Sequence, residues 1–96
     1  MNLKIIIWNV RGLNAMEKRM AVKSFLKGVR ADIICLQEIK VDMVDRGFVR
    51  DIWGGQYVEW EVLPARGTAG GILVCWDNRV VIREEVEIGG FSLSCL

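Results

Sequence analysis

The sequence predicts an α/β fold that begins with a βαβ unit. Residues 5–8 and 33–36 are runs of four apolar side chains rich in β-branched residues, which is typical of strands covered on both faces. Between these runs, apolar residues recur at the spacing of a helix. A strand, a helix and a second parallel strand in this order form a crossover that is right-handed in nearly all proteins.

The first helix is predicted to begin at Asn14 and to stop near Gly28. Glu17 follows Asn14 by three residues, as in a capping box, and glycine commonly ends a helix. The apolar residues of the helix are Val22, Phe25, Leu26 and Val29. The outward face is expected to carry Lys18, Arg19, Lys23 and Lys27. We favour a solvated surface for these cations over contact with nucleic acid.

A second, shorter helix is predicted between Asp42, its expected N-cap, and the glycine pair at 54–55. Its apolar residues, at i, i+4 and i+8, are Val44, Phe48 and Ile52. Residues 57–63 then alternate between apolar and polar side chains. This alternation indicates a half-exposed strand at a peripheral place in the sheet.

The remaining strands follow a glycine pair, Gly70 and Gly71, which opens an apolar strand over residues 72–76. We favour close strand packing or a bulge as the reason for these glycines over the approach of a phosphate to the backbone. Asp77 and Asn78 are typical turn residues.

Two more strands are expected after that turn. The first covers residues 80–88 and is predicted to turn inward the side chains of Val80, Ile82, Val86 and Ile88. Glu84 falls in the same phase and is an irregularity there. The second strand begins at Phe91 and reaches the end of the sequence.

Composition describes a globular chain without a general affinity for polyanions. The 96 residues are 52% hydrophobic and 26% charged, and the net charge of +1 leaves any contact with nucleic acid to local groups. Cys35, Cys75 and Cys95 have no metal-binding spacing, and we expect Cys35 and Cys75, which lie in apolar strand runs, to be core residues. The three cysteines lack the pairing typical of secreted proteins, so we expect no disulfide partner and a reducing, intracellular compartment, either nuclear or cytoplasmic. No signal peptide or membrane-spanning segment is predicted.

Polar residues stand where the first two predicted strands end. Asn9 follows the first apolar run, and Glu38 follows the second after Gln37. Because neighbouring parallel strands end on the same side of a sheet, we expect the two side chains to lie close together. An amide oxygen and a carboxylate are hard ligands that suit Mg²⁺ or Mn²⁺. Arg11 and Lys40 flank these ends and could contact phosphates, although an ordinary surface charge explains each one more simply.

Three motifs in this order resemble the endonuclease/exonuclease/phosphatase superfamily: WNVRGLN at 8–14, LQEIK at 36–40 and GTAGGILVCW at 67–76. The first looks most like the apurinic-type endonuclease domain of non-LTR (LINE-like) retrotransposons. The resemblance implies a four-layer α/β sandwich of two packed mixed sheets flanked by helices. Residues 1–96 would form only its N-terminal portion, so we expect a truncated domain.

The resemblance also implies roles for site residues. Glu38 would bind the metal, Mg²⁺ or Mn²⁺, and Asn9 would help to position the metal or a phosphate. The substrate of the complete domain would be DNA or another phosphodiester. The superfamily's hydrolytic His is absent, since the sequence contains no His, and neither Tyr57 nor the pair Asp77-Asn78 matches the superfamily's later motifs.

The sequence therefore predicts an N-terminal fragment of a metal-dependent DNA endonuclease that is inactive alone, with no complete catalytic set. Two alternatives stay open. The chain could be a non-catalytic remnant or an interaction module, or a fragment of a superfamily phosphatase acting on another phosphate ester.

Overall fold

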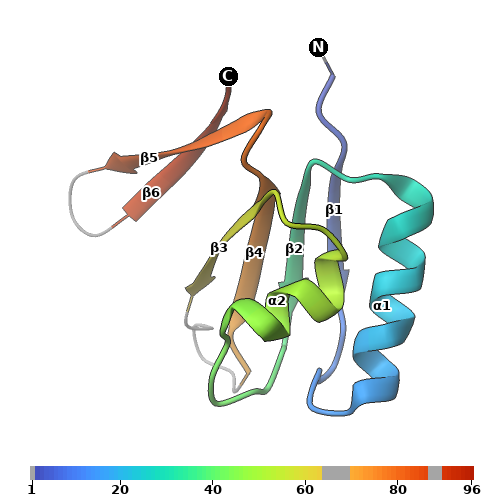
Figure 1. Cartoon of the computed structure of the whole chain (residues 1–96). Helices are drawn as coiled ribbons and strands as arrows, with labels where there is room; N and C mark the ends of the chain where they lie inside the picture. The colour runs from blue at the N-terminus through green and yellow to red at the C-terminus, as the bar shows by residue number, and fades with distance from the viewer. Residues whose placement is uncertain (1, 64–69, 87–89) are drawn as a thin grey trace.

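The computed structural model describes residues 2–63, 70–86 and 90–96. Its elements form a mixed α/β fold, and Figure 1 shows both helices beside the larger of two sheets. The elements are, in chain order, β1 (Ile5–Asn9), α1 (Met16–Val29), β2 (Ile33–Gln37), α2 (Arg46–Trp53), β3 (Val58–Leu63), β4 (Ile72–Asp77), β5 (Val81–Val86) and β6 (Gly90–Cys95). The predicted fold class is confirmed, including the second sheet.

The larger sheet has the strand order β1-β2-β4-β3. β1 and β2 are parallel, while β4 runs antiparallel to both of its neighbours. The register pairs Asn9 with Gln37, Gln37 with Ile72, and Leu63 with Ile72. Three strands therefore finish, and β4 begins, at one end of the sheet, which we call the site end. It lies at the bottom of Figure 1.

One face of this sheet packs against α1 and α2 and forms the main core. Ile34, Leu36, Leu73, Cys75 and Val58 supply its fully buried strand residues. The helices contribute Val22, Leu26, Val49 and Ile52. Cys75 is fully buried in this core, as predicted, and its burial raises the pKa of its thiol.

The opposite face is only partly covered. Ile33 and Trp76 pack there against Val81 of the β5-β6 sheet. Ile5 and Ile7, on the same face of β1, are 54% and 68% exposed. The prediction that the first strand is covered on both faces is therefore wrong, because β1 is an edge strand and the second sheet packs over β2 and β4 rather than over Ile5 and Ile7.

Both predicted helix starts are wrong by one to three residues. α1 begins after Ala15, and no side chain caps it, so Asn14 is not its N-cap. α2 begins after Asp45, whose Oδ1 accepts a hydrogen bond from the Phe48 backbone N–H at 2.8 Å. Asp42 therefore lies in the preceding loop.

Of the two predicted helix C-termini, one is confirmed and the other is wrong. Gly54 ends α2 with φ 83°, as predicted. α1 continues through Gly28 and ends at Arg30, a non-glycine residue with φ 52°.

The phase of β5 is also opposite to the prediction. Val81 is buried against Ile33 and Trp76, whereas Ile82 is 43% exposed and Glu84 is exposed. The turn at Asp77 explains this phase, since its carbonyl accepts from the Val80 N–H at 3.2 Å and β5 starts one residue later. Glu84 is thus an ordinary outward residue. Ile88 and residues 64–69 lie outside the described residues.

Candidate functional site

Asn9 and Glu38 meet at the site end of the sheet. Asn9 is the last residue of β1, and its Nδ2 donates a hydrogen bond to Oε2 of Glu38. The Asn9 Oδ1 accepts from the Arg11 backbone N–H at 3.1 Å. The amide is therefore fixed at both ends and holds one carboxylate oxygen of Glu38, while the other oxygen, Oε1, faces Lys40.

Backbone hydrogen bonds continue the pairing of the strands into the loops. Three N–H groups of the first loop donate to the second: Val10 to the Gln37 carbonyl at 3.0 Å, Gly12 to Glu38 at 2.7 Å and Leu13 to Ile39 at 2.8 Å. The second loop also joins the start of β4, since the Lys40 N–H donates to the Gly70 carbonyl at 2.8 Å. The segments around Asn9 and Glu38 are thus held as one unit.

The backbone at this end is strained. Arg11, Glu38 and Lys40 have φ values of 53°, 56° and 52°, in the left-handed region that L-residues seldom adopt. The fourth such non-glycine residue of the described chain is Arg30. Each costs about 1–2 kcal/mol, and strain of this kind persists where surrounding contacts impose it, often at functional sites. The cluster favours a functional interpretation of Glu38.

Gly70 explains how β4 comes so close to Glu38. A Cβ on Gly70 would lie 3.0 Å from the Cα of Glu38 and 3.3 Å from the Cγ of Lys40, and its φ is 129°. Only glycine meets both conditions without displacing its neighbours. The predicted reason for the glycine pair, close packing, therefore applies at Gly70, and the segment it packs against is the one that carries Glu38.

Arg11 and Lys40 are exposed on either side of the acidic residue. The Lys40 Nζ lies 3.9 Å from Oε1 of Glu38, a solvent-exposed pair that contributes little to stability. Arg11 makes no ion pair with any described residue. A hollow of about 670 Å³ lies on the Lys40 side of this end, lined by Lys40, Asp42 and Gly70 among others. Lys40 therefore already faces a carboxylate, whereas Arg11 is exposed and open to an anion.

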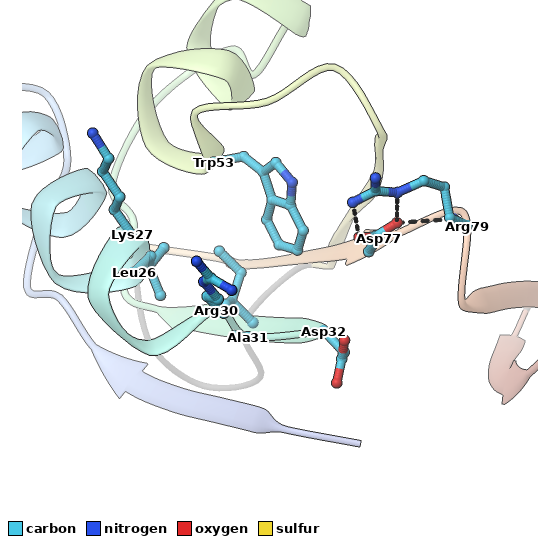
Figure 2. A pocket seen from close by; sticks show the side chains of 9 residues that line it. Leu26, Lys27, Arg30, Ala31, Asp32, Trp53, Asp77 and Arg79 are labelled. Atoms are coloured by element: carbon cyan, nitrogen blue, oxygen red, sulfur yellow. Dashed lines mark hydrogen bonds and ion pairs between the residues drawn. The ribbon is translucent and has the colours of Figure 1, made fainter. Parts of the chain in front are cut away.

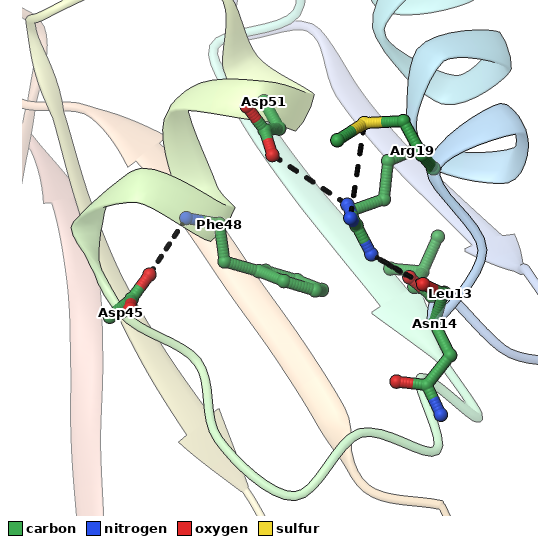
Figure 3. Close-up of polar contacts among 7 residues, drawn as sticks. Leu13, Asn14, Arg19, Asp45, Phe48 and Asp51 are labelled. Carbon is green, nitrogen blue, oxygen red and sulfur yellow. Dashed lines mark hydrogen bonds and ion pairs between the residues drawn. The ribbon is translucent and has the colours of Figure 1, made fainter.

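Arg19 anchors the loop that follows Asn9 (Figure 3). Its NH1 donates to the carbonyls of Leu13 at 2.8 Å and Asn14 at 2.7 Å, and its Nε lies 3.7 Å from Asp51 of α2. The guanidinium also lies 5.3 Å from the centre of the Phe48 ring. Its side chain is 15% exposed, so the prediction that Arg19 belongs to the solvated face is wrong. A long cation on a helix gives no sequence signal of such a role.

The donor set at this end fits a hard divalent cation in part. Glu38 offers a carboxylate oxygen, Asn9 an amide oxygen with one lone pair remaining, and Mg²⁺ commonly takes few protein ligands and keeps several waters. Within the described residues, no three His, Cys, Asp or Glu side chains gather into a metal cage. The arrangement suits an ion shared with a substrate phosphate.

The other residues compared with the superfamily's later motifs lie away from Glu38. Tyr57 stacks under the Arg79 guanidinium at 4.3 Å from its ring centre, and Arg79 pairs with Asp77 at 2.8 Å, at the opposite end of the sheet. The hydrogen bond from Arg79 lowers the pKa of Asp77. Burial raises the pKa of Cys35, so this thiol is no base at neutral pH. The described residues place no general base beside Glu38.

The structure also describes the state of the cysteines and the character of the helices. Cys35, Cys75 and Cys95 are all free thiols. Within the described part of the chain, no helix has the length and apolar character needed to cross a membrane.

Comparison with known proteins gives one family match. A model described as the Endonuclease/Exonuclease/phosphatase family matches residues 6–92. An exodeoxyribonuclease of Bacillus subtilis (strain 168) is 54% identical over 39 residues, which cover 41% of this chain and 16% of that protein. The DNA-(apurinic or apyrimidinic site) endonuclease 2 of Xenopus laevis is 47% identical over 45 residues, or 45% of this chain and 8% of that protein.

Solved structures give a matching fold. The crystal structure of AP endonuclease LMAP from Leishmania major is similar with a TM-score of 0.53 and 28% identity, over 79% of this chain and 24% of that one. This chain thus spans less than a quarter of the length of each of these relatives.

Proposed function

Because this chain belongs to the endonuclease/exonuclease/phosphatase family, we propose that it forms the metal- and phosphate-holding part of a divalent-metal-dependent phosphodiesterase that acts on DNA. The observation that carries the proposal is the Asn9–Glu38 hydrogen bond at the site end of the sheet. The two loops that carry these residues are joined by backbone hydrogen bonds. The nuclease relatives support DNA as the substrate class.

In this proposal each residue has a distinct role. Glu38 holds Mg²⁺ or Mn²⁺ through its carboxylate, and Asn9 orients that carboxylate and offers its amide oxygen to the ion or its water shell. Arg11 and Lys40 contact the phosphate from the two sides. A bound divalent ion supplies charge neutralisation at a phosphate oxygen and at the leaving oxyanion.

We further propose that residues 1–96 form a partial domain and lack activity on their own. The sequence has no His, and general-base assistance is worth about 10²–10⁴-fold in rate. The motif WNVRGLN at 8–14 supports a retrotransposon-type endonuclease over a phosphatase. A second candidate is an interaction module, which the exposed Ile5 and Ile7 on an edge strand favour.

The test is binding and cleavage of a duplex containing one abasic site, with Mn²⁺ or with EDTA. We expect Mn²⁺ to tighten binding of the duplex, Glu38→Gln to remove that increment, and cleavage to stay at trace level. Glu84→Gln is the matched control, since Glu84 is an exposed carboxylate on β5.

Three results would count against the proposal. If Mn²⁺ does not tighten binding of the duplex, or if it still does so in Glu38→Gln, the result would contradict the metal site. Turnover of p-nitrophenyl phosphate without DNA binding would indicate a phosphatase. Robust cleavage that depends on Glu38 would overturn the claim of inactivity.

A further inference from the structure

A second pocket lies at the end of the sheet opposite Glu38. It is bounded by the last turn of α1, the start of β2, the end of α2 and the end of β4, and its volume is about 420 Å³ (Figure 2). Pockets that bind small molecules commonly measure about 300–1,000 Å³. The proposed metal site uses none of the residues that line it.

Trp53 provides this pocket with an unoccupied aromatic surface. It is the last residue of α2 and is half-buried, and Figure 2 shows its indole projecting into the pocket. The ring pairs of the described chain are Trp8–Phe25 and Trp76–Phe91, and Trp60 lies under Arg46. Trp53 takes part in none of these contacts and packs partly against the main core, so the part of its indole that projects into the pocket is open to a planar ligand.

Arg30 brings an unpaired positive charge into the same space. Figure 2 shows its guanidinium in the pocket with Trp53. The residue ends α1 at φ 52°, a position where glycine is usual, so the arginine has an unfavourable backbone conformation there. No carboxylate among the described residues pairs with it. Lys27, in contrast, lies in the last turn of α1, where a cation stabilises the helix dipole.

The other charges of the pocket are largely satisfied. Asp77 accepts from the Arg79 side chain through both oxygens, at 3.1 and 2.8 Å. Asp32 accepts from the Lys4 N–H through Oδ2 at 2.8 Å, which leaves its other oxygen for a donor. The pocket therefore offers an aromatic face, a free guanidinium and one spare acceptor.

We propose that this pocket binds a nucleotide, with its base on Trp53 and its phosphate on Arg30. A guanidinium matches two phosphate oxygens with parallel N–H donors, and indole rings stack on any base. The spare oxygen of Asp32 accepts an N–H of the base or a hydroxyl of the sugar. The ligand is either a free mononucleotide or one nucleotide of single-stranded DNA, because both present this chemistry.

The experiment follows the Trp53 indole N–H signal by NMR in EDTA while the whole chain is titrated with dAMP, deoxyadenosine, inorganic phosphate or a five-nucleotide single strand. EDTA removes any contribution of the metal site. We expect dAMP to shift this signal and to bind more tightly than deoxyadenosine or phosphate. A tighter fit of the oligonucleotide would identify single-stranded DNA as the source, and a tighter fit of dAMP would identify the free nucleotide.

Arg30→Gly is the decisive variant. Glycine accommodates φ 52° better than arginine, so the variant keeps the fold while losing the charge. We expect dAMP to bind it about tenfold more weakly or worse, as for the loss of a charge-assisted hydrogen bond. Lys18→Ala, which removes an exposed cation outside the pocket, should bind dAMP as the wild type does. No shift of the Trp53 signal, or equal affinity in Arg30→Gly, would overturn the proposal.

Discussion

Gly70 is the residue on which the position of Glu38 most directly depends. A methyl group there would press on the Glu38 backbone, which cannot move without disturbing the bonds that join the loops. We predict that Gly70→Ala lowers the free energy of unfolding by about 1–3 kcal/mol. Urea denaturation measures this change.

Gly28→Ala is the control for that variant. Gly28 lies inside α1 with no neighbour in reach of a Cβ, so alanine should stabilise the protein by about 0.5–1 kcal/mol. Equal stability of Gly70→Ala and the wild type would mean that β4 does not approach Glu38 as closely as the structure indicates.

At the level of single residues, sequence patterns correctly predicted that Asn9 and Glu38 lie close together. Both follow short apolar strands, and neighbouring parallel strands must end together. Arg19 and Arg30 could not be found in this way, because the partners of a long cation depend on tertiary structure. Arg19 reaches a loop and a second helix, and Arg30 occupies a position where glycine is the usual choice.

At the level of elements, the start of α2 offers a direct comparison between two aspartates. Asp45 caps the helix by accepting from the Phe48 N–H, whereas Asp42 is exposed and makes no such bond. We predict that Asp45→Ala costs about 1 kcal/mol of unfolding free energy. Asp42→Ala should change it by less than about 0.5 kcal/mol. Urea denaturation of the two variants measures both changes. A larger loss of unfolding free energy in Asp42→Ala than in Asp45→Ala would indicate that Asp42 is the cap.

The elements themselves were predicted more reliably than their boundaries and phases. Apolar periodicity was sufficient to locate both helices and six strands, since it reflects burial. It could not choose between Asp42 and Asp45, which are equally good caps by residue type. Nor could it set the phase of β5, which the hydrogen-bonded turn at Asp77 determines.

In the whole molecule, the two ends of the larger sheet carry different chemistry. The site end gathers Glu38 with Asn9 and the exposed cations Arg11 and Lys40, in loops with strained backbone. The opposite end holds the pocket of Trp53 and Arg30. Between them, the uncovered face of β1 exposes Ile5 and Ile7, which the sequence predicted to be buried. Periodicity reports what a strand can bury, whereas the position of a strand in the sheet decides what is covered.

The central claim is that Glu38 holds a divalent cation at the site end, and calorimetric titration with Mn²⁺ tests it most directly. We predict weak binding by the wild type and a loss of about tenfold or more in Glu38→Gln, because neutral oxygens compete poorly with water for a hard cation. Glu84→Gln should bind Mn²⁺ as the wild type does. Circular dichroism would verify that each variant keeps its fold. Unchanged Mn²⁺ affinity in a folded Glu38→Gln would show that Glu38 is not a ligand and would contradict the claim.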